Sequence, residues 1–137
     1  MTTERVRAAL WGLLLWVSAS SPLLAAQSAA IVTISGEDTL TQATHTSIPV
    51  LVSLTEASAA YPLTLTPRIE GAAVELVRGR LLRSDAKLID ATHLRFDVPV
   101  VARSQGTAIL RVELMTYACD ADCQRVTAQA SRALHVR

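Results

Sequence analysis

Two cysteines, Cys119 and Cys123, lie four positions apart near the carboxyl end of this chain and are its only cysteines. In an oxidising compartment such a pair is normally bonded. A bond across so short a loop restricts the unfolded chain little, by about 2 kcal/mol in the chain-entropy model. The pair is therefore either a structural disulfide or, if its sulfurs are exposed, a dithiol that exchanges with a partner protein.

The charged neighbours of the cysteines act in opposite directions. Asp120 and Asp122 stand between them and disfavour a thiolate. Arg125, with Tyr117 predicted on the facing strand, favours one. The candidate site therefore consists of the two cysteines with Tyr117 and Arg125 as neighbours, and both interpretations of the pair stay open.

Soft-metal binding is a third possibility, because Cys-x3-Cys followed by a histidine is similar to the motif of copper-delivery proteins. Met115 and either His93 or His135 are the available further ligands. His135 follows Cys123 by twelve residues, roughly 35–40 Å along an extended strand. This distance makes it a poor ligand, and we expect no metal site and no cofactor.

The residues around the cysteines predict the hairpin that positions them. Between Ala108 and Ala118 the even positions hold Leu110, Val112 and Leu114. After Cys123 the same parity holds apolar side chains from Val126 to Val136, with Arg132 as the one exception. If the cysteines face each other across a three-residue turn, the numbers of every cross-strand pair sum to 242. In this register apolar residues meet apolar ones inside, and Tyr117 meets Arg125 outside. The sulfurs then lie on the outer face at the hairpin tip.

A family resemblance supports the redox alternative. The stretch Val112–Cys123 is a strand that ends in Tyr-x-Cys, with a short acidic gap before the second cysteine and a final strand. Over about the last 30 residues the chain resembles the end of the amino-terminal periplasmic domain of transmembrane thiol:disulfide interchange reductases. The resemblance implies an immunoglobulin-like fold, and it implies that Cys119 and Cys123 relay electrons to periplasmic oxidoreductases.

The rest of the chain shows short alternating apolar segments separated by Gly, Pro and Ser/Thr clusters. Residues 78–90 fit either a strand pair or a short helix. The pattern predicts an all-β, immunoglobulin-like β-sandwich of about seven short strands, spanning residues 27–137, with an aliphatic core. The other expected strands are Ile31–Ile34, Ser47–Leu54, Leu63–Leu65 bounded by Pro62 and Pro67, Ala72–Leu76 and Leu94–Val100.

The amino-terminal residues have the order of a secretory signal peptide. Arg5 and Arg7 precede the apolar run Ala8–Val17, and small residues follow, so we expect cleavage after Ala26, with Ala30 as the alternative site. The run is about half of the roughly 20 residues that span a bilayer. We therefore expect residues 1–26 to be removed and the mature chain to have no membrane span, an uncleaved anchor being the alternative.

Net charge and the absence of known catalytic motifs reduce the number of function classes that fit the sequence. Residues 1–26 hold one of the 12 acidic and two of the 13 basic residues, which leaves 11 of each and no net charge to attract nucleic acid. Gly-x-Ser-x-Gly, glycine-rich phosphate loops and His-Glu-x-x-His are absent, and His45, His93 and His135 are interpreted as surface residues. We expect a periplasmic or secreted accessory domain that binds a protein partner, and an enzyme only if its cysteines exchange disulfides.

Overall fold

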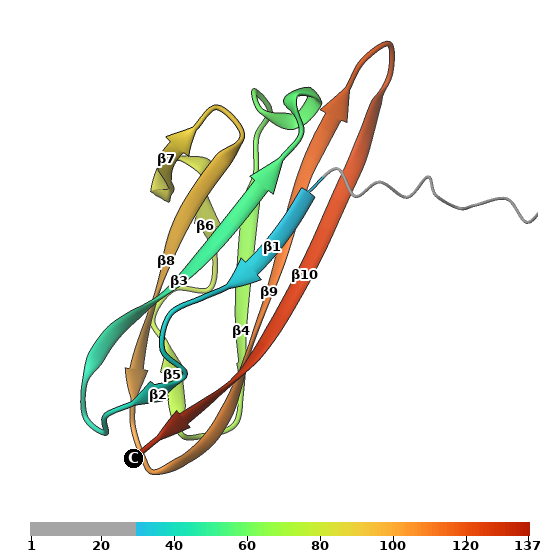
Figure 1. Ribbon diagram of the computed structural model, residues 1–137. Coiled ribbons are helices and arrows are strands. Elements are labelled where there is room, and N and C mark those ends of the chain that lie inside the picture. Colours follow the sequence, from blue (N-terminus) through green and yellow to red (C-terminus); the bar gives the residue numbers. More distant parts are fainter. Residues whose placement is uncertain (1–29) are drawn as a thin grey trace, which may run out of the picture.

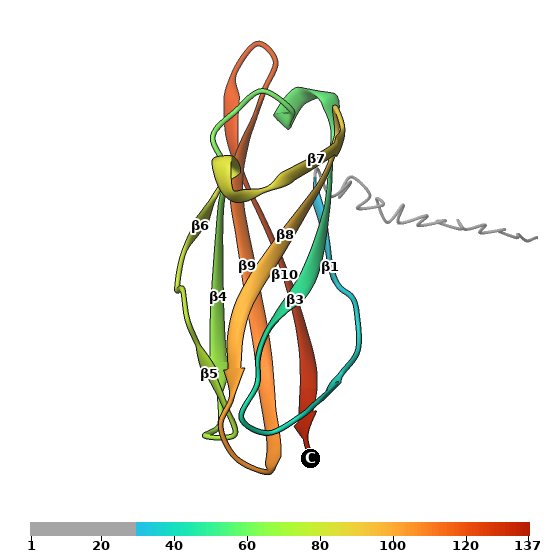
Figure 2. The same cartoon turned by 90° about the vertical axis from the view of Figure 1, so that its left-hand side faces the viewer.

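The computed structural model describes residues 30–137, which form two β-sheets packed face to face (Figures 1 and 2). The predicted signal peptide lies outside the described residues. Within them there is no α-helix, and two short 3-10 helices, η2 and η3, lie between strands. The elements in chain order are β1 (Ala30–Ile34), β2 (Thr39–Leu40), β3 (His45–Leu54), η2 (Glu56–Ser58), β4 (Thr64–Glu70), β5 (Val74–Leu76), β6 (Leu81–Leu82), η3 (Arg83–Asp85), β7 (Lys87–Asp90), β8 (His93–Ala102), β9 (Gly106–Cys119) and β10 (Cys123–Val136).

Each sheet has five strands. The first sheet has the order β1-β3-β8-β5, and β7 also pairs with β8. The second has the order β2-β10-β9-β4-β6. All pairings are antiparallel except β2 with β10, which is parallel. The all-β sandwich predicted from the alternating segments is confirmed.

The core lies between the sheets and follows the alternation of the strands. Even-numbered side chains of β3, β8 and β9 point inward, so Val50 faces Phe96 across one sheet, and Leu110 and Leu114 pack from the other. All four side chains are fully buried. Removing such a side chain from water stabilises the fold by about 1.5–3 kcal/mol. Phe96 is the only phenylalanine of the chain, so the core is otherwise aliphatic, as predicted.

The strands differ from the prediction in number and length. The described residues contain ten strands, whereas about seven were expected. Three of the ten, β2, β5 and β6, are only two or three residues long, which is too short to show an alternating pattern. By contrast, β9 and β10 each have 14 residues. The expected end of a strand at Pro67 is also wrong, since β4 continues through Pro67 to Glu70. Beyond Leu65 this strand pairs only with β9 among the described strands, and an edge strand tolerates proline.

Residues 78–90 contain two short strands and a helical turn. The sequence was compatible with either a strand pair or a short helix here, and the structure has both. β6 pairs with β4 in the second sheet, β7 pairs with β8 in the first, and the helical turn η3 connects them. The Asp85 carboxylate accepts hydrogen bonds from the backbone N–H of Leu82 at 2.8 Å and from two guanidinium nitrogens of Arg78 at 3.1 Å each. This segment therefore crosses from one sheet to the other.

Candidate functional site

The β9–β10 hairpin has the register that the sequence predicts. Cys123 lies opposite Cys119, Arg125 lies opposite Tyr117, and the pairing continues without a shift to Val136 opposite Gly106. Every pair has numbers that sum to 242. The cysteine spacing and the local alternation together predict this register, because a slip by one residue would turn the apolar side chains out of the core.

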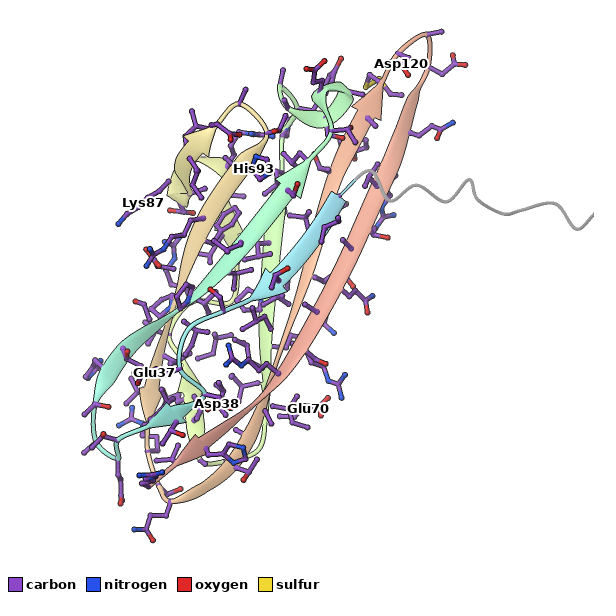
Figure 3. All side chains as sticks on the ribbon, in the orientation of Figure 1. Glu37, Asp38, Glu70, Lys87, His93 and Asp120 are labelled. Atoms are coloured by element: carbon purple, nitrogen blue, oxygen red, sulfur yellow. A yellow bond between two sulfur atoms is a disulfide. The ribbon has the colours of Figure 1, made fainter. Side chains whose placement is uncertain are left out.

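The two cysteines form a disulfide at the tip of this hairpin, and their Cα atoms are 4.0 Å apart. Cys123 is exposed and Cys119 is half-buried. The turn between them is closed by the backbone N–H of Asp120, which donates to the carbonyl of Asp122 at 3.1 Å. Figure 3 shows Asp120 at the far end of the molecule, beyond the two sheets. Of the two cysteines, Cys123 is thus the more accessible to a partner.

The end of the hairpin projects beyond the sandwich (Figures 1 and 2). The pairing of β4 with β9 ends at Met115, and β10 has no second neighbour among the described strands before His135. Thr116 is the last anchor, because its buried hydroxyl donates to the Pro62 carbonyl at 2.9 Å. Residues 117–125 therefore form a two-stranded arm, here called the projecting ribbon.

A two-stranded ribbon is marginally stable in water without a third strand or a packed face. The disulfide joins its two strands where no third strand supports them. The Tyr117 side chain is 38% exposed on the outer face, and Arg125 opposite it is also exposed. Asp120 and Asp122 add two carboxylates at the tip. On reduction these carboxylates would oppose a thiolate and the guanidinium would favour one.

The structure does not bring the proposed soft-metal ligands together. His135 lies at the opposite end of β10 from the cysteines, where its Nδ1 is 3.2 Å from the Thr107 hydroxyl oxygen. His93 belongs to β8 of the other sheet. Residues 30–137 contain no group of three or more His, Cys, Asp or Glu side chains arranged to hold a metal ion.

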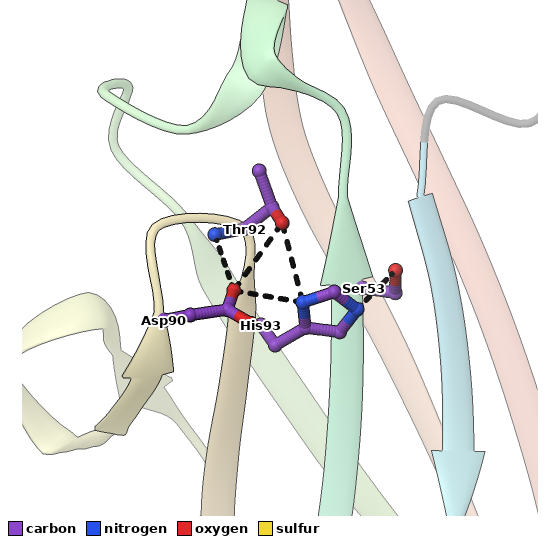
Figure 4. A network of polar contacts seen from close by, with 4 residues as sticks. All are labelled: Ser53, Asp90, Thr92 and His93. Atoms are coloured by element: carbon purple, nitrogen blue, oxygen red, sulfur yellow. Dashed lines mark hydrogen bonds and ion pairs between the residues drawn. The ribbon is translucent and has the colours of Figure 1, made fainter.

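A second polar cluster lies on the outer face of the first sheet (Figure 4). His93 is exposed, as predicted, but its ring contacts both Asp90 and Ser53. The sequence shows the spacing of Asp90 and His93 across a turn. It does not show Ser53, which is 40 residues from His93 and lies opposite it only because β3 pairs with β8.

Comparisons with known proteins identify the fold class. No family model matches the chain, and no curated protein matches it. Among solved structures the chain is similar to native α2-macroglobulin from Escherichia coli, in a crystal structure that spans domain MG7 to the carboxyl terminus. The TM-score is 0.52, the sequence identity is 14%, and the match covers 79% of this chain. A cryo-EM structure of the native conformation of the same protein has a TM-score of 0.50, 14% identity and coverage of 80%.

This chain spans only 16% and 7% of the chains in those two structures. With the two packed antiparallel sheets, the similarity defines the domain as an immunoglobulin-like β-sandwich. In the part of the chain that the structure describes, no helix is long and apolar enough to cross a membrane.

Proposed function

We propose that this chain is an exported accessory domain that binds a periplasmic or membrane protein through its projecting ribbon. The observation that carries the proposal is the shape of the hairpin. A disulfide holds residues 117–125 together beyond the last supporting strand, where the sandwich itself gains no core from them. A rigid arm of this kind costs a partner little conformational entropy on binding.

The surface of the ribbon has features of an interface. Tyrosine and arginine are enriched at the centres of protein interfaces, and Tyr117 lies opposite Arg125 on the exposed face. β10 also leaves one edge unpaired among the described strands from Cys123 to Leu134. An extended segment of a partner can add to such an edge through backbone hydrogen bonds.

Export is part of the proposal and rests on sequence chemistry. Arg5 and Arg7, the apolar run Ala8–Val17 and the small residues up to Ala26 have the pattern of a cleavable signal. The disulfide agrees with this destination, since disulfides persist in oxidising compartments and are rare in the cytosol.

Site-specific crosslinking tests the ribbon as the binding surface. A photoreactive amino acid at Ala121, in the tip, should capture one defined partner, and the same group at Ser104, in the turn before β9, should not. Tyr117→Ala and Arg125→Ala should reduce capture at the tip by more than tenfold, because interface anchors of these types often contribute more than about 1.4 kcal/mol. Equal capture from both positions would contradict the proposal.

A thiol-disulfide relay is the second candidate, favoured by the exposure of Cys123 and by the resemblance to the reductase domain. A dithiol of a membrane reductase would first reduce the pair and become a disulfide itself. One cysteine thiolate would then attack a partner's disulfide, forming a mixed disulfide and releasing the partner's other sulfur, which takes a proton. The second cysteine would attack its own partner cysteine's sulfur in the mixed disulfide, which re-forms the Cys119–Cys123 bond and leaves the partner reduced.

The reduction potential separates the two roles. A value below about −300 mV indicates a structural disulfide, and a value near −200 mV favours the relay. Cys119→Ser and Cys123→Ser should each accumulate a mixed disulfide with a partner only if the relay operates. A low potential with no trapped partner would leave the binding role alone.

A further inference from the structure

Ser53, His93 and Asp90 form a chain of polar contacts on the outer face of the first sheet (Figure 4). The Ser53 hydroxyl oxygen lies 3.4 Å from His93 Nε2. On the other side of the ring, His93 Nδ1 lies 2.8 Å from a carboxylate oxygen of Asp90. The order hydroxyl, imidazole, carboxylate is the one in which a histidine can remove a proton from a serine.

The contacts assign the proton of the neutral ring. An ionised carboxylate only accepts hydrogen bonds, so Nδ1 must donate to Asp90 and Nε2 is left as the acceptor for the Ser53 hydroxyl. Asp90 is itself held by the backbone N–H of Thr92 at 2.9 Å. Hydrogen bonds from His93 and then from that N–H lower the pKa of Asp90, which keeps it charged. A fixed negative charge there stabilises the imidazolium that forms when Ser53 loses its proton.

An apolar groove lies beside the serine. Ser53, Asp90 and His93 line this groove together with apolar residues of β1, β3, β7 and β8, and its volume is about 280 Å³. Its exposed apolar side chains are Ile31 of β1, Leu51 of β3 and Ile89 of β7, which are 58%, 38% and 59% exposed. Exposed apolar surface of this kind binds apolar groups. The groove is open to solvent, and its volume is sufficient for a short acyl chain.

We propose that Ser53 is a nucleophilic serine that accepts acyl groups from small carboxylic esters, with His93 as its base. The Ser53 oxygen forms a bond to the ester carbonyl carbon as its proton passes to His93 Nε2. The bond from that carbon to the leaving oxygen then breaks, and the leaving alcohol takes the proton from His93. Water attacks the acyl-serine by the same route, which releases the acid and restores Ser53.

This proposal goes beyond partner binding and uses a different face of the molecule. In the structure the site supplies a nucleophile, a base, a charged positioning residue and a groove. Esters with a good leaving group need the least stabilisation of the developing oxyanion. The expected substrates are therefore activated esters with short apolar acyl chains, and His93 and Ser53 are the groups that contact the reacting atoms.

Hydrolysis of p-nitrophenyl butyrate by the purified protein tests the assignment. Ser53→Ala and His93→Gln should each lower the rate at least tenfold. Matched controls lie on the strand of Ser53 and on the same face, where Ser47 and His45 are exposed. Ser47→Ala and His45→Gln should change the rate less than twofold. Persistence of the full rate in Ser53→Ala would overturn the proposal, since the histidine alone would then be responsible.

The role of Asp90 as a positioning residue has its own readout. Asp90→Asn keeps an oxygen that can accept from the Thr92 N–H, but removes the charge. It should lower the acylation rate several-fold with little change in thermal stability, and Asp90→Glu should restore part of the rate. If both variants react like the wild type, Asp90 has only a structural role and the proposed chain of contacts does not activate Ser53.

Covalent labelling of the wild-type protein is independent of any variant. A fluorophosphonate probe should add one phosphonyl group per chain, and peptide mass spectrometry should place it on Ser53. The Ser47→Ala protein should be labelled equally. Absence of label on Ser53, or a label spread evenly over the exposed serines, would refute the assignment.

Discussion

At the scale of single residues, the exceptions to the alternating pattern carry the most information. Arg132 occupies an even, inward position of β10, and the other even-numbered residues from Val126 to Val136 are apolar. It is half-buried, and its guanidinium donates to the carbonyl of Ile34 on β1 at 3.3 Å. The arginine thus joins the open edges of the two sheets, a role that its alkyl stem can combine with packing.

Replacing this arginine tests the link between the edges. Arg132→Ala should lower the free energy of unfolding by about 1 kcal/mol, the usual net contribution of one hydrogen bond. Arg125→Ala, on the same strand at an exposed position, should change the free energy of unfolding by less than about 0.5 kcal/mol. Urea denaturation of both variants gives the comparison, and equal effects would show that Arg132 makes no stabilising contact.

Asp85 is a second residue whose effect can be measured. The hydrogen bond from Arg78, followed by that from the Leu82 N–H, holds the pKa of Asp85 below its ordinary value of 3.8. Because the pKa is depressed in the folded state, the contribution to stability is complete above pH 3.8 and is lost as the pH falls through the lower, folded value.

An NMR titration of the Asp85 carboxyl carbon should therefore give a midpoint below 3.8, and Arg78→Ala should move it upward. The signals of residues 81–85 should shift in the same pH range as the turn loosens. A midpoint at or above 3.8 in the wild type would show that the Arg78 contact does not persist in solution.

At the scale of elements, the hairpin and the crossing segment behave differently. The hairpin is formed by neighbours in sequence, so its register followed from local alternation and the cysteine spacing. Its ribbon then extends beyond β4, which ends the support from a third strand. The segment 78–90 pairs with strands of both sheets. β6 pairs with β4, which lies earlier in the chain, whereas β7 pairs with β8, which follows it directly, so local pattern does not show that the two parts join different sheets.

Removing the disulfide should loosen the ribbon without unfolding the sandwich. The double variant Cys119→Ser with Cys123→Ser should lose at most about 2 kcal/mol of stability. Hydrogen exchange should accelerate in residues 117–125 and stay slow in β3 and β8. Opening the ribbon breaks no contact of the core, so the core strands stay protected. Reduced wild-type protein serves as the matched control. Global acceleration of exchange would show that the disulfide supports the whole fold.

At the scale of the whole molecule, one core joins both sheets. Phe96 is fully buried at its centre and is the only large aromatic ring in a core of Val, Leu, Ile and Ala. Phe96→Ala should therefore destabilise the protein by about 3–5 kcal/mol, and Phe96→Leu by much less, since most of the volume is kept. Thermal unfolding followed by circular dichroism measures both. A loss below 1 kcal/mol for the alanine variant would mean that the core collapses around the gap.

The sequence by itself determined the sheet class, the inward face of each long strand and the terminal hairpin with its opposed cysteines, because these depend on side-chain alternation and on residues close in the chain. Tertiary structure alone decided which strands lie side by side. It brought Arg132 to Ile34 across 98 residues and Ser53 to His93 across 40. It also ended the pairing of β4 with β9 at Met115, so the ribbon has no third strand beside it among the described residues. Such pairings depend on how strands far apart in the chain pack together, and the alternation of side chains within one strand does not show which strand is its neighbour.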